Sequence, residues 1–186
     1  NGVLKRYRNT EGIRKDPLYM RVLKGIASHE YLVHLRRPSL MTTIAHRNAQ
    51  PYLAPGHTLA FAHNGYFQHH DEYRAQFADQ LEGTSDSEVG FRYFLSLLKD
   101  NGFPDVLVKT HQVLQGKANI GVMSAGGEIW FYAGNSDNQA YTFKLDGMRF
   151  AVTSLHSNDD FLFQTIFPQA SSVAQFPRHS AIQVRL

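Results

Sequence analysis

The 186-residue sequence predicts an α+β fold in which helices cover antiparallel sheets. Three observations lead to this prediction. Strand-like apolar runs dominate the first third of the chain, helical periodicity dominates the middle, and alternation returns after Gly116. A hydrophobic content of 42% with 19% charged residues is typical of a globular chain that can bury a core. No internal repeat or linker divides the sequence, so we expect a single domain spanning residues 1–186.

The first third is expected to hold three strands and one helix. Residues 3–8 and Tyr31–Leu35 are short segments that predict strands, and the apolar run Thr58–Ala62 predicts a buried strand. Asp16 can cap a helix and Pro17 suits the first helical position. We therefore expect the helix to begin at this pair.

The middle of the chain is predicted to fold into three helices. Asn64-Gly65 indicates a turn, because both residues tolerate positive φ. Residues 71–81 form the first helical pattern. Ser85 and Glu88 are three residues apart, which is the spacing of a capping box, and they introduce the second helix. Pro104 introduces the third.

After the helices the pattern alternates again and predicts two hairpins. The first covers residues 119–133, and the second covers 139–154 around a strong Asp146-Gly147 turn. The remaining chain is rich in loops, with a short helix expected at 159–166. Residues 181–186 read as a closing strand.

Composition narrows the possible functions. A net charge of +3 without a basic cluster argues against a nucleic-acid partner. No apolar run approaches the roughly 20 residues of a membrane span, so no membrane partner is expected. The sequence contains no cysteine, which excludes disulfides and thiolate metal sites within it and leaves the cytoplasm as the default compartment. The densest histidine cluster, His69-His70, has adjacent side chains that diverge on a helix, so no metal site is expected.

Four short motifs, in order and at family-like spacing, resemble those of class II glutamine amidotransferases. They are Val33-His34-Leu35-Arg36, Asn48-Ala49-Gln50-Pro51-Tyr52, Ala62-His63-Asn64-Gly65 and Thr84-Ser85-Asp86-Ser87-Glu88. Gln50 is a departure, because the family has histidine there. The resemblance implies the N-terminal-nucleophile hydrolase fold, a four-layer αββα sandwich of antiparallel sheets. It also implies that this chain lacks the first strand or strands of that fold.

The resemblance further implies roles for individual residues in hydrolysis of the glutamine side-chain amide. Arg36 would hold the substrate α-carboxylate and Asp86 the α-ammonium, which matches their charges and geometry. The Asn64 side chain and the Gly65 N–H would form the oxyanion hole. The predicted substrate-binding set also includes His63 and Ser39.

The family attacks glutamine with an N-terminal cysteine, and this sequence has none. Three hypotheses therefore stay open. The chain is a glutamine-hydrolysing domain whose cysteine-bearing segment precedes Asn1, an inactive relative that binds an amino acid or acts as a structural or regulatory subunit, or an unrelated α+β interaction protein. No cofactor is expected. A separate synthetase would accept the ammonia, and the sequence does not predict the oligomeric state.

Overall fold

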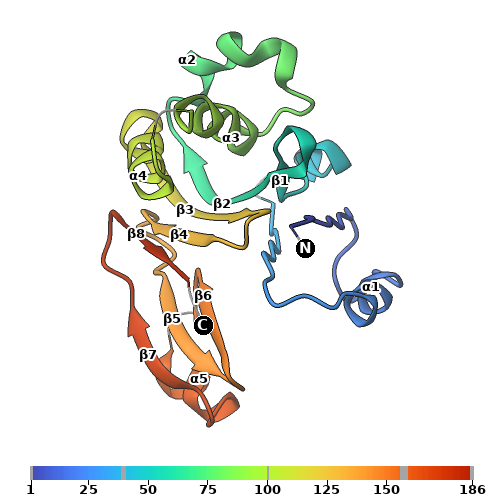
Figure 1. The fold of residues 1–186 in the computed structure, drawn as a ribbon, viewed down its shortest axis with the longest axis vertical. Helices are drawn as coiled ribbons and strands as arrows, with labels where there is room; N and C mark the ends of the chain where they lie inside the picture. The colour runs from blue at the N-terminus through green and yellow to red at the C-terminus, as the bar shows by residue number, and fades with distance from the viewer. Residues whose placement is uncertain (1, 39–40, 100, 156–158, 185–186) are drawn as a thin grey trace.

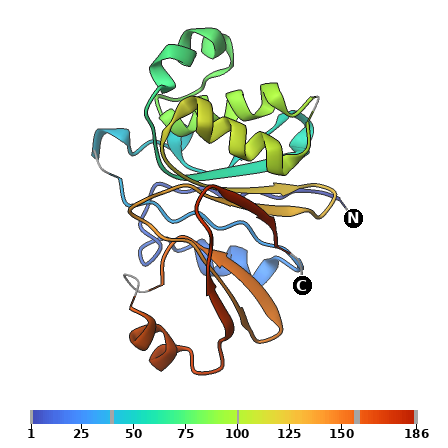
Figure 2. The ribbon, with the colours of Figure 1, turned by 90° about the vertical axis from the view of Figure 1, so that its left-hand side faces the viewer.

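The computed structural model describes residues 2–38, 41–99, 101–155 and 159–184. Two antiparallel sheets are layered between helices, as predicted (Figure 1; Figure 2). The five-stranded sheet has the order β1-β2-β3-β4-β8, and the three-stranded sheet has the order β6-β5-β7. The larger sheet consists of β1 (Tyr52–Leu53), β2 (Leu59–Phe67), β3 (Gly116–Ser124), β4 (Ile129–Ala133) and β8 (Ser180–Gln183). The smaller sheet consists of β5 (Tyr141–Leu145), β6 (Met148–Val152) and β7 (Ser171–Gln175).

The helices of the described residues lie mainly on the outer side of each sheet. The α-helices are α1 (Tyr19–Gly25), α2 (His70–Arg74), α3 (Asp86–Leu97), α4 (Phe103–Leu114) and α5 (Asp160–Ile166). Short 3-10 helices are η1 (Met41–Thr43), η2 (His46–Asn48), η3 (Pro55–His57) and η4 (Ala75–Gln80). No helix in this described part is long and apolar enough to cross a membrane.

Helices α3 and α4 cover one face of the larger sheet (Figure 2). The main hydrophobic core lies between these two helices and the sheet. Phe61 from β2 contacts Phe91 and Phe94 of α3, with ring centroids 5.5 Å apart in both pairs. At Gly90 of α3 a Cβ atom would lie 2.1 Å from the Phe67 ring. Glycine at this position therefore lets α3 approach β2 closely enough to hold the start of the helix against the strand end.

The smaller sheet carries its own helix and core. Phe143 of β5 packs against Phe163 of α5, with ring centroids 5.0 Å apart. A second set of buried side chains, including Phe131 of β4 and Phe176, joins the two sheets. The layers therefore follow one another in the order of helices α3 and α4, the larger sheet, the smaller sheet and helix α5.

Strand β2 is the central element for the site, and it corrects one prediction. It pairs with β3 in unbroken register from Leu59↔Ser124 to Phe67↔Gly116. Asn64-Gly65 lies inside this ladder and does not form the predicted turn. The dipeptide tolerates a turn, but a nine-residue partner strand supplies backbone hydrogen bonds that keep the segment extended.

The other predicted elements were found where neighbouring residues indicate them, and were wrong where a strand needed a distant partner. The two hairpins and helices α3, α4 and α5 are confirmed. The closing strand predicted at 181–186 is found as β8, Ser180–Gln183, and residues 185–186 of the prediction lie outside the described residues. Asp16 accepts the N–H groups of Leu18 and Tyr19 at 2.9 and 3.2 Å, but α1 begins at Tyr19 and not at the predicted Asp16-Pro17 pair. The predicted strands at 3–8 and Tyr31–Leu35 are wrong, because neither segment pairs with a described strand.

Some boundaries also differ. The helix predicted at 71–81 divides into α2 and the 3-10 helix η4. The loop-rich region before the closing strand contains the unpredicted β7, which pairs with β5. Its exposed side chains carry no apolar alternation, so periodicity could not reveal it.

Candidate active site

The ring of His63 is the buried centre of the candidate site. It has no exposed side-chain surface, and it stacks on Phe67 with ring centroids 4.0 Å apart. Its Nε2 lies 3.3 Å from the carbonyl oxygen of Lys117, which can only accept, so Nε2 carries the proton of the neutral ring. Nδ1 then accepts from the Ser87 hydroxyl at 2.9 Å. The ring therefore links β2, β3 and the start of α3 and presents no free nitrogen to a ligand.

The backbone of His63 is held by the side chain of Gln50. Oε1 of Gln50 accepts the His63 N–H at 2.6 Å, and Nε2 donates to the His63 carbonyl at 3.2 Å. Nε2 of His34 donates to the same carbonyl at 3.2 Å. The amide of Gln50 thus pairs with the His63 backbone as a neighbouring strand would, at the position where the resemblance expects histidine.

Asp86 begins α3 and lies against the end of β2. Its Oδ2 accepts the Phe67 N–H at 2.9 Å and lies 3.9 Å from Nδ1 of His63. The Asp86 side chain remains 18% exposed, and its Oδ1 contacts no donor among the described residues. One carboxylate oxygen therefore positions the side chain, while the other is available to a ligand.

The helix cap before Asp86 is confirmed in part. Ser85 accepts a hydrogen bond from the Ser87 N–H at 3.1 Å, as an N-cap residue does. The reciprocal half of the capping box is wrong. Glu88 instead accepts the N–H groups of Glu82 and Gly83, both at 2.8 Å. Its buried carboxylate therefore fixes the loop before the helix.

Arg36 is exposed and is connected to the helix loop through a chain of hydrogen bonds. Its guanidinium donates to the carbonyl and the hydroxyl of Thr43 at 3.1 and 2.6 Å. Buried Asn48 donates to the same carbonyl at 3.1 Å and accepts the Thr84 N–H at 2.9 Å. The chain Arg36–Thr43–Asn48–Thr84 ends two residues before Asp86.

The hydroxyl of Tyr52 is buried. Burial is the main cause that raises the pKa of Tyr52 to about 12, and the carboxylates of Glu88 and Asp86 act in the same direction. The guanidinium of Arg36 acts in the opposite direction.

Asn64 and Gly65 follow His63 on β2. Asn64 points to the sheet face opposite His63, as alternation along a strand requires, and contacts the loop after β4. Gly65 has a φ of 144° and lies so close to Lys117 that a Cβ atom would be 1.7 Å from its carbonyl oxygen. Sequence reasoning missed Asn135 and Asn138, the two partners of the Asn64 side chain, because their loop carries no distinguishing motif.

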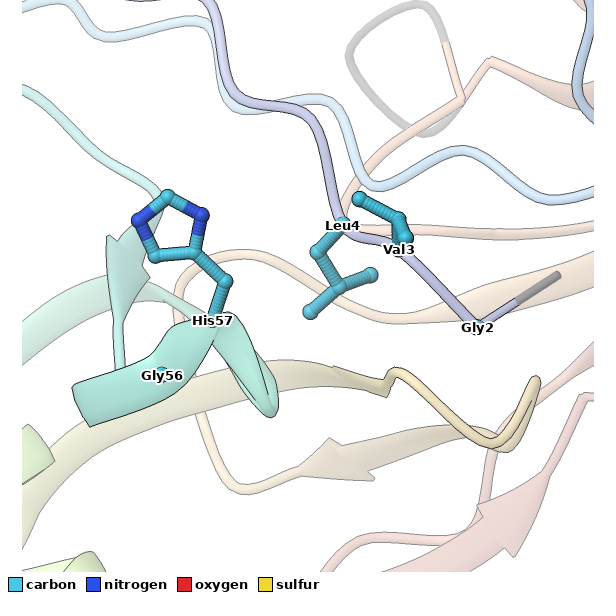
Figure 3. A pocket seen from close by; sticks show the side chains of 5 residues that line it. All are labelled: Gly2, Val3, Leu4, Gly56 and His57. Carbon is cyan, nitrogen blue, oxygen red and sulfur yellow. The ribbon is translucent and has the colours of Figure 1, made fainter.

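Two hollows lie near the N-terminal segment. His34, Arg36 and Gln50 help to line a cleft of about 990 Å³ between that segment and the larger sheet. A smaller hollow of about 390 Å³ lies between residues 2–4 and η3 and contains no predicted site residue (Figure 3). Ser39 lies outside the described residues. Within those residues, no group of three or more histidine or acidic side chains could hold a metal ion.

The buried histidines are expected to make stability depend on pH. Burial is the main cause that lowers the pKa of the His63 ring, and Asp86 acts in the opposite direction. Burial likewise lowers the pKa of His34 and of His111. Histidine in an unfolded chain has a pKa of about 6.5, so the stabilisation is complete above that pH and is lost as the pH falls below it. We expect protonation linked to His63 to lower the free energy of unfolding by about 1 to 3 kcal/mol as the pH falls below this value.

Urea unfolding at pH 7 and pH 5 measures this effect. His63→Gln does not titrate and should reduce the difference between the two pH values. His57→Gln is the matched control, because His57 is exposed and its replacement should leave the difference unchanged. Equal unfolding free energies at both pH values in the unchanged protein would contradict the prediction.

Comparison with known proteins identifies solved structures that share the fold of this chain. No family model matches the chain, and no curated protein matches it. Solved structures do match. A glutamine aminotransferase class-II domain protein from Silicibacter pomeroyi has a TM-score of 0.66 at 17% identity, covering 98% of this chain and 85% of that one.

Two larger proteins match over part of their length. Glutamine phosphoribosylpyrophosphate amidotransferase from B. subtilis, complexed with ADP and GMP, has a TM-score of 0.58 at 16% identity over 82% of this chain. A structure described as the allosteric regulatory enzyme of purine biosynthesis has a TM-score of 0.56 at 17% identity over 76% of this chain. The present chain covers only 34% and 30% of those two chains. The likeness confirms the predicted sandwich of antiparallel sheets.

Proposed function

We propose, from the fold that this chain shares with class II glutamine amidotransferase structures, that it is a domain for hydrolysis of the glutamine side-chain amide. The products would be glutamate and ammonia, and the ammonia would pass to an acceptor. One observation carries the proposal. The four motifs, spread over residues 33–88, join in one hydrogen-bond network around His63. Coincidental motifs in an unrelated protein would have no reason to meet in this way.

Each proposed role follows from the chemistry of the side chain. The guanidinium of Arg36 suits the α-carboxylate of glutamine, and the free Oδ1 of Asp86 suits the α-ammonium. Asn64 and the Gly65 N–H would stabilise the oxyanion. His63, whose ring is buried, would act by positioning Asp86 and the strand rather than by touching substrate. Ser39 would complete the binding set.

The attacking group would be a thiol encoded outside these residues, since the 186 residues contain no cysteine. The 186 residues would then belong to a single glutamine-hydrolysing domain. An ammonia acceptor would be supplied by a separate synthetase or by another part of a longer protein.

A second candidate function is amino-acid binding without hydrolysis. The charges of Arg36 and Asp86 match the α-carboxylate and α-ammonium of an amino acid, and binding through them needs no nucleophile. Release of ammonia separates the two candidates. Glutaminase activity in the protein translated from the whole coding sequence would support hydrolysis, and glutamine binding without ammonia release would support the binding module.

Glutamine binding itself is tested by calorimetry on the 186-residue chain. We expect Arg36→Ala and Asp86→Ala each to weaken L-glutamine binding by about 10- to 100-fold, because each removes a charge-assisted contact worth about 1.5–3 kcal/mol. The matched control is Arg37→Ala, which removes an exposed neighbouring charge. D-Glutamine should bind poorly, because its α-carboxylate and α-ammonium exchange positions. Unchanged binding in both variants would refute these two assignments.

A further inference from the structure

The side chain of Asn64 is held by two asparagines that no sequence motif indicated. They lie in the loop of residues 134–138, directly after β4. Nδ2 of Asn135 donates to the Asn64 carbonyl at 3.1 Å and to its Oδ1 at 3.3 Å. Nδ2 of Asn138 donates to the same Oδ1 at 3.1 Å. The amide oxygen of Asn64 therefore accepts from two partners.

The loop that carries these asparagines is fixed by a third one. Asn119 of β3 is buried, and its Oδ1 accepts the N–H groups of Gly134 and Asn135 at 3.2 and 3.1 Å. Its Nδ2 donates to the Asn138 carbonyl at 2.7 Å. All three contacts are with backbone groups, whose donor or acceptor character cannot change. They therefore determine both the orientation of the Asn119 amide and the path of the loop.

Backbone contacts also determine the orientation of Asn135. Its Oδ1 accepts the N–H groups of Asp137 and Asn138 at 2.9 and 3.2 Å. An amide oxygen held by two backbone donors turns its Nδ2 the other way, which is toward Asn64. Asn64 must meet this donor with its oxygen. Its own Nδ2 then faces away and has no hydrogen-bond partner among the described residues.

We propose that Asn135 and Asn138 are positioning residues that keep the Asn64 carboxamide turned with its N–H donors toward the ligand. The inference rests on the proposed function for its catalytic consequence, but the orientation itself does not. An asparagine χ2 torsion is broad and roughly two-fold, so an unsupported amide could present either end. A flipped amide would place an oxygen lone pair against a developing oxyanion. The two donors on Oδ1 remove this alternative.

Replacement of Asn135 with aspartate tests the orientation. Asn135→Asp keeps the acceptor for the two backbone N–H groups but replaces the donor to Asn64 with an oxygen that can only accept. We expect the Asn64 amide to turn its N–H groups toward residue 135 and the Asn138 amide to turn its oxygen toward them, because its Oδ1 has no hydrogen-bond partner among the described residues. In the 186-residue chain, NMR should show rapid solvent exchange of the Asn64 side-chain protons before the change. After the change, it should show slowed exchange and a nuclear Overhauser contact to residue 135.

A charge control separates orientation from electrostatics. Ser136→Asp adds the same charge to the neighbouring, exposed loop position without touching Asn64. In the protein translated from the whole coding sequence, Asn135→Asp should lower kcat by about 100- to 1,000-fold, as loss of one oxyanion donor does, with little change in KM. Ser136→Asp should lower kcat far less. Backbone amide spectra of both variants should match those of the unchanged protein away from the loop, which checks that the fold is kept.

The possible outcomes distinguish this inference from the proposed function. Unchanged exchange of the Asn64 protons in Asn135→Asp would overturn the inferred orientation. A flipped amide with unchanged kcat would overturn its positioning role. If the unchanged protein neither binds nor hydrolyses glutamine but the amide still flips, the proposed function fails and the inferred orientation stands.

Discussion

Replacing Asn64 with alanine is expected to lower the turnover of glutamine hydrolysis by about 100- to 1,000-fold. The Asn64 amide would donate to the oxygen that becomes negative in the transition state, and this contact strengthens as the charge develops. Arg36 and Asp86 would still bind the two charged groups of the substrate. We therefore expect KM to change little while kcat falls, which is the signature of an interaction made mainly in the transition state.

Steady-state kinetics on the protein translated from the whole coding sequence measure this effect. The matched control is Asn101→Ala, because the Asn101 side chain is exposed and, among the described residues, donates only to the carbonyl of Leu97, the last residue of α3. Full activity of Asn64→Ala would remove Asn64 from the oxyanion hole. A rise in KM at constant kcat would instead assign Asn64 to ordinary substrate binding.

Replacing Gly65 with alanine is expected to destabilise the fold by about 3 kcal/mol or more. Two independent costs add at this position. The φ of 144° is rarely adopted by residues with a side chain, and the new Cβ would lie 1.7 Å from the Lys117 carbonyl oxygen. The obstructing atom belongs to the backbone of the paired strand. Relief therefore requires β2 and β3 to separate where they support Asn64 and His63.

Alanine substitutions at two other glycines separate the cost of backbone strain from the cost of the steric clash. Gly147 has a positive φ of 76° but nothing within 4 Å of a new Cβ, so Gly147→Ala measures backbone strain alone. Gly25 has neither constraint. Urea unfolding should show the largest loss in the free energy of unfolding for Gly65→Ala, a smaller loss for Gly147→Ala and the smallest for Gly25→Ala. If Gly65→Ala loses no more stability than Gly147→Ala, then β2 and β3 separate at this position at little cost, and the predicted steric contribution is wrong.

Local signals in the sequence predicted much of the fold. The Asp146-Gly147 turn, the Ser85 cap and the periodicity of α3 and α4 depend on residues only a few positions apart, and the structure confirms them. Strand predictions without a partner were less reliable. Tyr31–Leu35 has strand-like composition, but a strand also needs a neighbour to receive its hydrogen bonds, and composition does not supply one.

The candidate site was predictable as a set of motifs but not as an arrangement. The resemblance singled out Arg36, Asn64 and Asp86 from their neighbours in the sequence. It could not show that Gln50 holds the backbone of His63, because that contact joins residues 13 positions apart through a side chain. The partners of Asn64 lie more than 70 positions away in a loop of ordinary composition.

By itself, the sequence determined the α+β class, the hairpins and the start of helix α3 at Ser85. These properties follow from side-chain periodicity and turn chemistry, which are readable along the chain. Only the tertiary structure decided that Asn64-Gly65 lies in a strand, that the His63 ring is buried, and that Asn135 and Asn138 hold the Asn64 amide. Each of these depends on which donor meets which acceptor across distant segments, and packing alone sets those pairs.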